Sequence, residues 1–490
     1  MKQKYPVICF GIFFAAGFLP GIPRESSAQR QRSQKLADAP SQVMLAATVQ
    51  AQNMDAFPMH PASAAPTMPS AQGDNSASAA SIPTQLTLHA AEQIAIRNNP
   101  RVHVGQLLAR AQHQVYRETR SAYLPQLEGG AAGVKADNGS RYTIDDLRST
   151  RLITHVGGGI TLDQMIYDFG HTSNLIAASK LREKAQNANA LASRLDVVLV
   201  TDQAFYNALE AQALVRLAQQ TVDTRDTTNR QITELTKNKL RSDLDLAISQ
   251  ENVEQAKLLL LDAQTQYQTE LNALTAVLGF DQPIHCELTD DTRAVSLPPP
   301  DQDALVQLAL KQRPDLMALN YDQQAAKKYS RAQHEQMLPT FATIGTVGVT
   351  PVRSDAYFDS NWFGAVGLTL KVPIFNGFLY SAQASEADQR AKAAQENLRH
   401  LRNNVARDVR DGWLETNTSY EKIAATEKFL RAANLGLDLA QSRYKLGLSS
   451  IVELSQAQLA QTQASIENVN ARFEYELSLA ALNYQLGNLP

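Results

Sequence analysis

Carboxylates that follow two breaks in the helical pattern are the residues of this chain whose types and spacing could do chemistry. Asp243 and Asp245 follow Ser242, and Glu453 follows Ser450. Both serines are good helix N-caps, and acids in a first helical turn favour the helix dipole. Repeated around a symmetry axis, three carboxylates per chain would also form a negative ring that attracts cations and could bind a divalent ion. The two roles are compatible.

The sequence contains no pattern typical of catalysis or of a resident cofactor. Its nine histidines are scattered, and no zinc-protease, nucleophile-elbow or phosphate-loop pattern is present. The two cysteines, Cys9 and Cys286, form no metal-binding pair and no disulfide framework. A net charge of −3 with 19% charged residues gives no electrostatic reason to expect nucleic acid. We therefore expect no enzyme, no cofactor and no metal site.

The N-terminal region has the composition of an exported protein. Residues 1–28 combine a basic start, an apolar stretch and the small residues SSA, which predicts a cleaved signal peptide. An uncleaved membrane anchor is the alternative, although the apolar stretch is short for a span. Residues 29–83 are rich in Ala, Ser, Gln, Pro and Met without hydrophobic periodicity. This composition predicts a disordered segment.

The remaining chain consists of two copies of one unit. The octet QIAIRNNP at Gln93–Pro100 recurs as QLALKQRP at Gln307–Pro314, which is 214 residues later (314 − 100). Towards the C-terminal end of each copy, seven positions within Ala256–Gly279 match seven within Ala464–Gly487. Repetition at a fixed offset indicates duplication. We expect a first repeat over 84–285, a linker over 286–299 and a second repeat over 300–490.

Each repeat is predicted to be mainly helical. A first helical stretch is broken at Pro100 or Pro314, because proline cannot continue a preceding helix. A long helix is expected over Thr172–Lys237 or Leu379–Leu446, followed by a short break and a last helix. About 66 residues at about 1.5 Å per residue span on the order of 100 Å. An intracellular coiled coil is the alternative, against which the signal peptide and the glycine-rich insertions argue.

The glycine- and threonine-rich insertions lack a helical period and predict four strands, at about 123–135, 151–167, 338–350 and 361–375. Each is long enough to cross a bilayer at a tilt. Aromatic residues gather at both ends of these runs, as in interfacial belts. At the helix-facing end they are Tyr123, Tyr167, Phe169, Phe375 and Phe378, and at the loop end they are Tyr142, Tyr357, Phe358 and Trp362. Two soluble hairpins are the alternative.

Four strands cannot close a transmembrane barrel, and an open sheet edge does not occur in lipid. If the strands span a bilayer, several chains must share one barrel. Three copies would supply twelve strands, which lies within the known range. The helices would then continue the barrel on one side of the membrane.

The sequence resembles the TolC-like outer-membrane efflux protein family, the outer membrane factors. The resemblance is carried by the order and spacing of the duplicated unit, the NP and RP helix starts, the LP strand starts, and the IYDFG and IFNG segments. The resemblance implies a mixed α/β membrane protein. It would be a homotrimer with a 12-stranded β-barrel in the outer membrane of a Gram-negative bacterium and an α-helical barrel in the periplasm. The implied function is the passive exit duct of a tripartite efflux pump or type I secretion system. The implied partners are a periplasmic adaptor (membrane fusion) protein, an inner-membrane transporter of RND, ABC or MFS type, and outer-membrane lipid.

The resemblance also assigns roles to the helix breaks, which correspond to the periplasmic tip of the family. Leu446, Gly447 and Leu448 fit its adaptor-contact element. Asp243, Asp245, Glu453 and Tyr444 would belong to the gate. In the first repeat the adaptor position has no glycine, and Ser449 and Gln456 replace a basic and an acidic residue of the family's tip. We therefore expect a gate that is held by a different set of bonds.

One other function remains open. A helical envelope scaffold or adhesin without transport would keep the helices but would not need aromatic belts. A stand-alone diffusion porin would need more strands per chain than this sequence has. The exported substrate is not identified by any residue pattern.

Overall fold

The computed structural model describes residues 85–135, 141–142, 150–151, 155–284, 286–289, 297–299, 301–349 and 362–488. The chain divides into two units, Met1–Ala77 and Ser78–Pro490, and these residues all belong to the second. The predicted signal peptide and the segment 29–83 lie outside the described residues, as do Tyr357 and Phe358. The predicted linker is described only in part, and only the backbone of Tyr142 is described.

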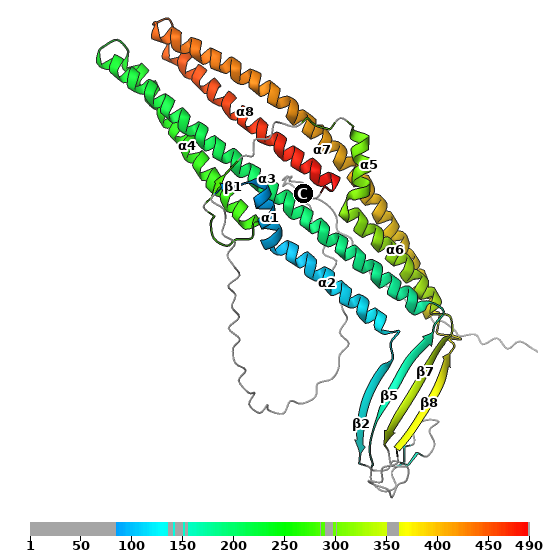
Figure 1. Ribbon diagram of the computed structural model, residues 1–490. Coiled ribbons are helices and arrows are strands. Elements are labelled where there is room, and N and C mark those ends of the chain that lie inside the picture. Colours follow the sequence, from blue (N-terminus) through cyan, green and yellow to red (C-terminus); the bar gives the residue numbers. More distant parts are fainter. Residues whose placement is uncertain are drawn as a thin grey trace, which may run out of the picture. The chain divides into compact units, whose positions relative to one another are not determined.

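The two repeats contain the same succession of major elements (Figure 1). In the first they are α1 (Leu88–Asn98), α2 (Pro100–Ser121), β2 (Gln126–Val134), β5 (His155–Tyr167), α3 (His171–Lys237) and α4 (Asp243–Val277). In the second they are α5 (Gln302–Gln312), α6 (Pro314–Glu335), β7 (Thr340–Val349), β8 (Trp362–Lys371), α7 (Leu379–Lys445) and α8 (Ile451–Leu486). Short strands β1 (Gln85–Leu86) and β6 (Glu287–Leu288) pair in parallel, and β3 (Arg141–Tyr142) pairs with β4 (Thr150–Arg151).

Proline separates the two helices at the start of each repeat, as the sequence predicts. Pro100 and Pro314 occupy the first turns of α2 and α6, and the residues before them are extended. This follows because proline disfavours the helical conformation in the residue that precedes it. The Asn99 side chain accepts a hydrogen bond from the Arg101 amide at 2.9 Å, whereas Arg313 caps α6 without a side-chain bond.

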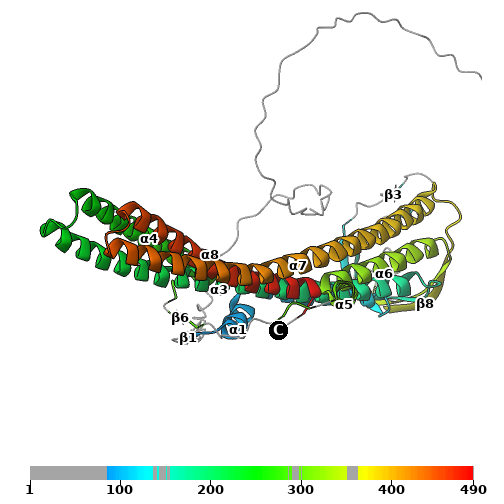
Figure 2. The same ribbon diagram turned by 90° about the horizontal axis from the view of Figure 1, so that it is seen from above.

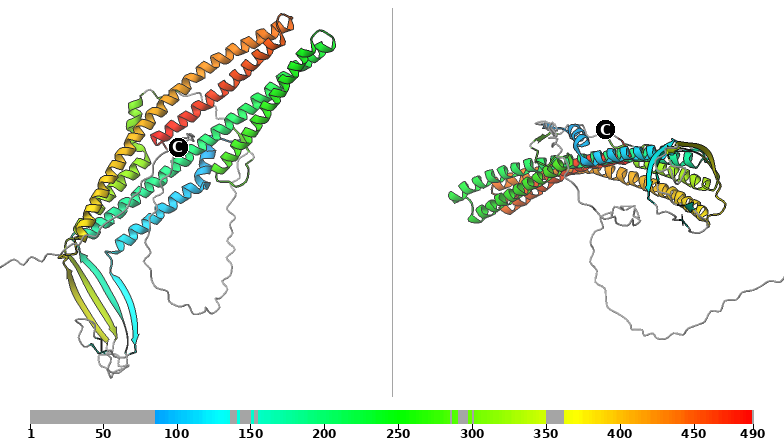
Figure 3. Two further views of the ribbon diagram at one scale, coloured as in Figure 1. Left: turned by 180° about the vertical axis from the view of Figure 1, so that it is seen from behind. Right: turned by 90° about the horizontal axis from the view of Figure 1, so that it is seen from below.

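The long helices α3 and α7 each have 67 residues. Shorter helices pack along them in succession, α2 and α4 along α3, and α6 and α8 along α7 (Figures 1 and 3). The packed helices form one curved layer (Figure 2). Many of the buried side chains are alanines, including Ala178, Ala208 and Ala464. Small side chains let helix axes approach closely, so the layer is held by short contacts along its length.

The four long strands form one antiparallel sheet in the order β2-β5-β7-β8. Glycines bring β5 and β7 close together: a Cβ atom added at Gly159 would lie 2.8 Å from the Val347 carbonyl oxygen. Gly159 therefore lies where the two strands approach closely, which is a common reason for glycine within a strand. Strand β8 ends at Lys371 rather than near 375, because Pro373 has no amide hydrogen for the ladder.

The predicted fold class, long helices with four strands per chain, is confirmed. Within the described part of the chain, none of the helices combines the length and the apolarity that a membrane span requires.

Candidate functional site

The two helix breaks are turns at the ends of two long hairpins, α3–α4 and α7–α8 (Figure 1). Both turns have a left-handed residue, Lys239 at φ 59° and Gly447 at φ 73°. Both also have the same closing bond: the Leu240 amide donates to the Leu235 carbonyl at 2.9 Å, and the Leu448 amide donates to that of Arg443 at 2.8 Å. This is the usual C-terminal motif of a helix. The first turn thus keeps this geometry although lysine replaces the favoured glycine.

Serines cap the helices that leave both turns. The Ser242 hydroxyl accepts a hydrogen bond from the Asp245 amide at 3.1 Å, and the Ser450 hydroxyl accepts one from the Glu453 amide at 3.3 Å. The capping role expected from the sequence is confirmed. The acids of the first turns are therefore fixed near the hairpin tips.

A contact between Arg241 and Tyr444, which we call the latch, joins the two hairpins. The Arg241 guanidinium lies 4.2 Å from the centre of the Tyr444 ring and donates a hydrogen bond to the Tyr444 backbone carbonyl. Tyr444 is only 5% exposed. Burial raises the pKa of its hydroxyl and the nearby Asp245 carboxylate raises it further, while Arg241 opposes both. The Tyr444 side chain is therefore a neutral phenol, and the Arg241 guanidinium lies over its ring.

The other predicted gate residues are distributed around this latch. Asp245 faces Tyr444 from α4. Glu453 instead forms an ion pair with Arg443 of its own hairpin, at 3.1 Å between Oε1 and Nε. Asp243 is exposed, and no ion pair involves it in the described structure. The structure thus brings Asp245 and Tyr444 together, places Glu453 on the second hairpin and leaves Asp243 in solvent.

The predicted adaptor-contact residues lie at the outermost point of the second hairpin. Leu446 and Leu448 are largely exposed, although both are apolar. A Cβ atom added at Gly447 would meet nothing within 4 Å. Leu240 and Leu244 are similarly exposed on the first hairpin. Each tip therefore presents apolar side chains that the protomer itself does not cover.

Aromatic residues gather where the sheet meets the helices. The Tyr167 and Phe169 rings lie 4.8 Å apart, the Phe375 and Phe378 rings lie 5.6 Å apart, and Tyr123 is exposed at the end of α2. The sequence interpretation missed Phe341, whose ring lies 6.5 Å from that of Phe169. Trp362 is exposed at the opposite end of the sheet, where β8 begins.

A second cluster of ionisable groups lies where α1 contacts α3. Burial raises the pKa of Asp202 to about 8, and the nearby Glu92 carboxylate contributes to the shift. Glu92 is 8% exposed. Both residues line a cavity of about 260 Å³. Asp202 therefore keeps its proton at neutral pH, which limits the repulsion between the two neighbouring carboxyl groups.

Among the residues that the structure describes, no group of three or more His, Cys, Asp or Glu side chains could hold a metal ion.

Comparison with known proteins identifies the family to which this chain belongs. A family model described as outer membrane efflux protein matches residues 92–280 and 305–488, so the chain belongs to the outer membrane efflux protein family. It is 26% identical to the outer membrane protein TolC of Escherichia coli K12 over 400 residues, which cover 76% of each chain. It is 22% identical to the outer membrane efflux protein BepC of Brucella suis over 417 residues, which cover 82% of this chain and 86% of BepC. A crystal structure of CusC superposes with a TM-score of 0.72 at 18% identity, covering 82% of this chain and 92% of that one.

The chain is therefore an outer-membrane exit duct of the kind that serves efflux pumps and secretion systems. The predicted family, function and location in the outer membrane with extension into the periplasm are confirmed, and the helical scaffold without transport is set aside.

Proposed function

We propose that three copies of this chain form one passive duct, which is closed at its periplasmic end by the hairpin tips. The observation that carries the trimer is the four-stranded sheet with two unpaired edges, β2 and β8. An open edge cannot be solvated in lipid. Because the strands alternate in direction, β8 of one copy can pair antiparallel with β2 of the next. Three copies then close a twelve-stranded barrel.

The latch supports a gate at the opposite end of the duct. The α3–α4 and α7–α8 hairpins must separate if the tip is to widen, and Arg241 joins them through the ring and carbonyl of Tyr444. Around a three-fold axis, Asp243, Asp245 and Glu453 would form the negative ring of the closed tip. Carboxylates that are crowded in this way repel one another, and the repulsion favours opening of the tip. The contact between Arg241 and Tyr444 opposes this opening because it joins the two hairpins.

The exposed tip of the second hairpin supports contact with a periplasmic adaptor. Leu446 and Leu448 provide apolar surface and Gly447 leaves room for close approach of another chain. Adaptor binding there would compete with the closed arrangement of the hairpins. The duct itself catalyses no reaction, and an inner-membrane transporter of RND, ABC or MFS type supplies the energy.

Cysteine cross-linking between strand edges tests the shared barrel. In a chain with Cys286→Ser, Ala131→Cys at the centre of β2 is combined with a cysteine at successive positions of β8. Opposite residues of an antiparallel pair lie about 4.5–5.5 Å apart, within disulfide range. Oxidation of outer membranes should give covalent trimers at the β8 positions that face Ala131. The control pair, Ala131→Cys with Ala342→Cys in β7, should remain monomeric because β8 lies between β7 and the β2 edge of the next copy. Monomers at every β8 position would contradict the proposal.

A further inference from the structure

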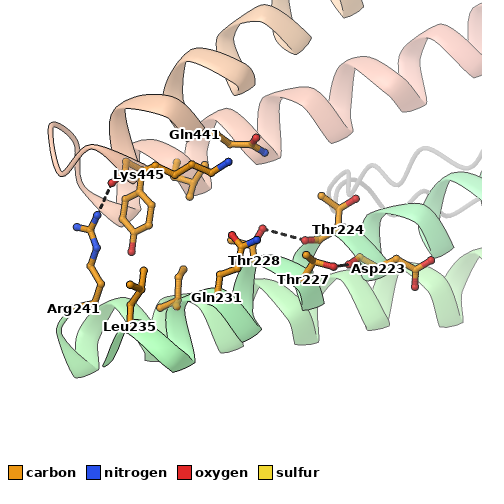
Figure 4. Close-up of a pocket in the computed structure, with 12 residues that line it drawn as sticks. Asp223, Thr224, Thr227, Thr228, Gln231, Leu235, Arg241, Gln441 and Lys445 are labelled. Atoms are coloured by element: carbon orange, nitrogen blue, oxygen red, sulfur yellow. Dashed lines mark hydrogen bonds between the residues drawn. The ribbon is translucent and has the colours of Figure 1, made fainter. Parts of the chain in front are cut away.

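A pocket of about 400 Å³ lies between the two hairpins directly beside the latch (Figure 4). Sites for small molecules are usually about 300–1,000 Å³. Both hairpins line this one, so a molecule bound in it would contact both. Residues 223–235 of α3 and Arg241 of the first turn line it from the first hairpin, and residues 441–445 of α7 with Leu454 of α8 line it from the second.

The middle of the pocket is apolar. Ile232 and Leu454 are 1% and 2% exposed and belong to a hydrophobic cluster that joins the hairpins. The hydroxyls of Thr224, Thr227 and Thr228 already donate to backbone carbonyls four residues earlier, at 2.8–3.0 Å. A bound molecule would therefore meet the threonine methyl groups and Leu235, with the Gln231 and Gln441 amides beside them.

The ends of the pocket differ in charge. Arg241 lies at the end near the turns, and the Lys445 side chain runs from that end towards Gln441 (Figure 4). No ion pair or hydrogen bond engages the Lys445 ammonium within the described structure. Asp223, more than four helical turns before Arg241 in sequence, lies at the other end and accepts a hydrogen bond from Gln219 at 3.1 Å. In Figure 4, Gln441 and Lys445 of α7 lie across the pocket from Gln231 of α3. A negative group would be repelled from Asp223 and attracted to the Lys445 ammonium, although the Asp245 carboxylate that faces Tyr444 offsets part of the positive charge near the turns.

We propose that this pocket binds a small amphiphilic anion, a carboxylate or sulfonate on an apolar body, and thereby holds the two hairpins together. The anionic group lies against Lys445, and the apolar body lies against Leu235 and the methyl groups of Thr227 and Thr228. Binding is independent of the proposed gate, whereas its effect on opening rests on that gate. A bound anion would also pair with the Lys445 ammonium, which takes no part in the latch.

The test is a fluorescence titration of the purified full chain in detergent with 8-anilinonaphthalene-1-sulfonate, whose emission rises in apolar sites. N-phenyl-1-naphthylamine, which has the same rings without the sulfonate, is the matched probe. We expect saturable binding of the sulfonate alone. Lys445→Met should weaken it about tenfold, equivalent to about 1.4 kcal/mol. Thr228→Trp should abolish it by filling the pocket. Lys237→Met, which removes an exposed charge outside the pocket, should leave it unchanged. The signal from detergent micelles is common to all variants and cancels.

Equal sulfonate affinity in the parent chain and in Lys445→Met would overturn the proposal, and so would equal binding of the uncharged probe. If Thr228→Trp fails to fold, the sulfonate affinity of Lys445→Met still tests the proposal, because Lys445 is exposed. A second measurement adds the sulfonate to the tip side of single channels in a bilayer, where longer closed intervals are expected. Binding with unchanged closed intervals would overturn the holding effect. Loss of binding, with the gate still sensitive to Arg241, would refute only the pocket.

Discussion

Removal of the latch cation should open the duct more often. In Arg241→Met the aliphatic stem remains, while the guanidinium and its two interactions with Tyr444 are lost. A hydrogen bond from a charged donor contributes about 1.5–3 kcal/mol and a partly exposed cation–π contact about 0.5–1 kcal/mol. Because Arg241 is partly exposed, we take the low end, about 2 kcal/mol per protomer. That value corresponds to a shift of about 30-fold in the equilibrium between joined and separated hairpins.

Single-channel recording in planar bilayers measures this shift directly. Arg241→Met should raise the open probability at least tenfold and shorten the closed intervals. Lys237→Met is the matched control, since it removes the same charge four residues away, where the ammonium pairs at 2.6 Å with Glu234 of its own helix. Equal open probabilities in the Arg241→Met and Lys237→Met channels would refute the role of the latch. A similar rise in both would show that net charge, rather than the contact, closes the tip.

Three other perturbations test separate parts of the structure. The raised pKa of Asp202 means that its contribution to stability is fully present below its ordinary pKa and is lost as pH rises towards about 8. The free energy of unfolding should thus fall by up to about 1.4 kcal/mol per unit between pH 5 and 8. Asp202→Asn should flatten the pH dependence of thermal unfolding followed by circular dichroism, and an unchanged slope would exclude this origin. Gly348→Ala should reduce the amount of protein assembled in outer membranes, because the new Cβ would lie 2.7 Å from the Gly158 carbonyl oxygen. Gly345→Ala in the same strand meets only ordinary contacts and should assemble normally; equal assembly of the two would contradict the close approach. Gly447→Trp should abolish export in cells, whereas Gly447→Ala, which shares the cost of the positive φ, should retain it; export by the tryptophan variant would argue against adaptor contact there.

The sequence predicts the helical part of the fold closely because its signals are local. Pro100 and Pro314 at the helix starts and Ser242 and Ser450 at the caps all act within a few residues. Long helix α3 was expected from Thr172 and begins at His171. The duplication also predicts that both repeats have the same order of elements. These patterns need no knowledge of tertiary contacts.

The strands and the latch were less predictable for physical reasons. Strand limits depend on pairing with neighbours, so aromatic residues such as Tyr123 and Phe375 lie beyond the ends of β2 and β8 although the sequence favours their inclusion. Arg241 and Tyr444 are 203 residues apart, and no local pattern shows that a turn residue reaches the other hairpin. The only hint was the replacement of the family's basic residue by Ser449. This replacement indicates that the tip lacks the family's cation at that position, but it does not predict that Arg241 supplies one from the other hairpin.

Electron microscopy of the protein extracted from outer membranes would show whether three chains share one barrel. We expect a hollow particle with three-fold symmetry, a twelve-stranded barrel within the detergent belt, and helical hairpins that converge at the opposite end. Such a map would also show whether the β8 edge of each protomer pairs with β2 of the next. A single chain with a free sheet edge, or a solid rod without a detergent belt, would contradict the account.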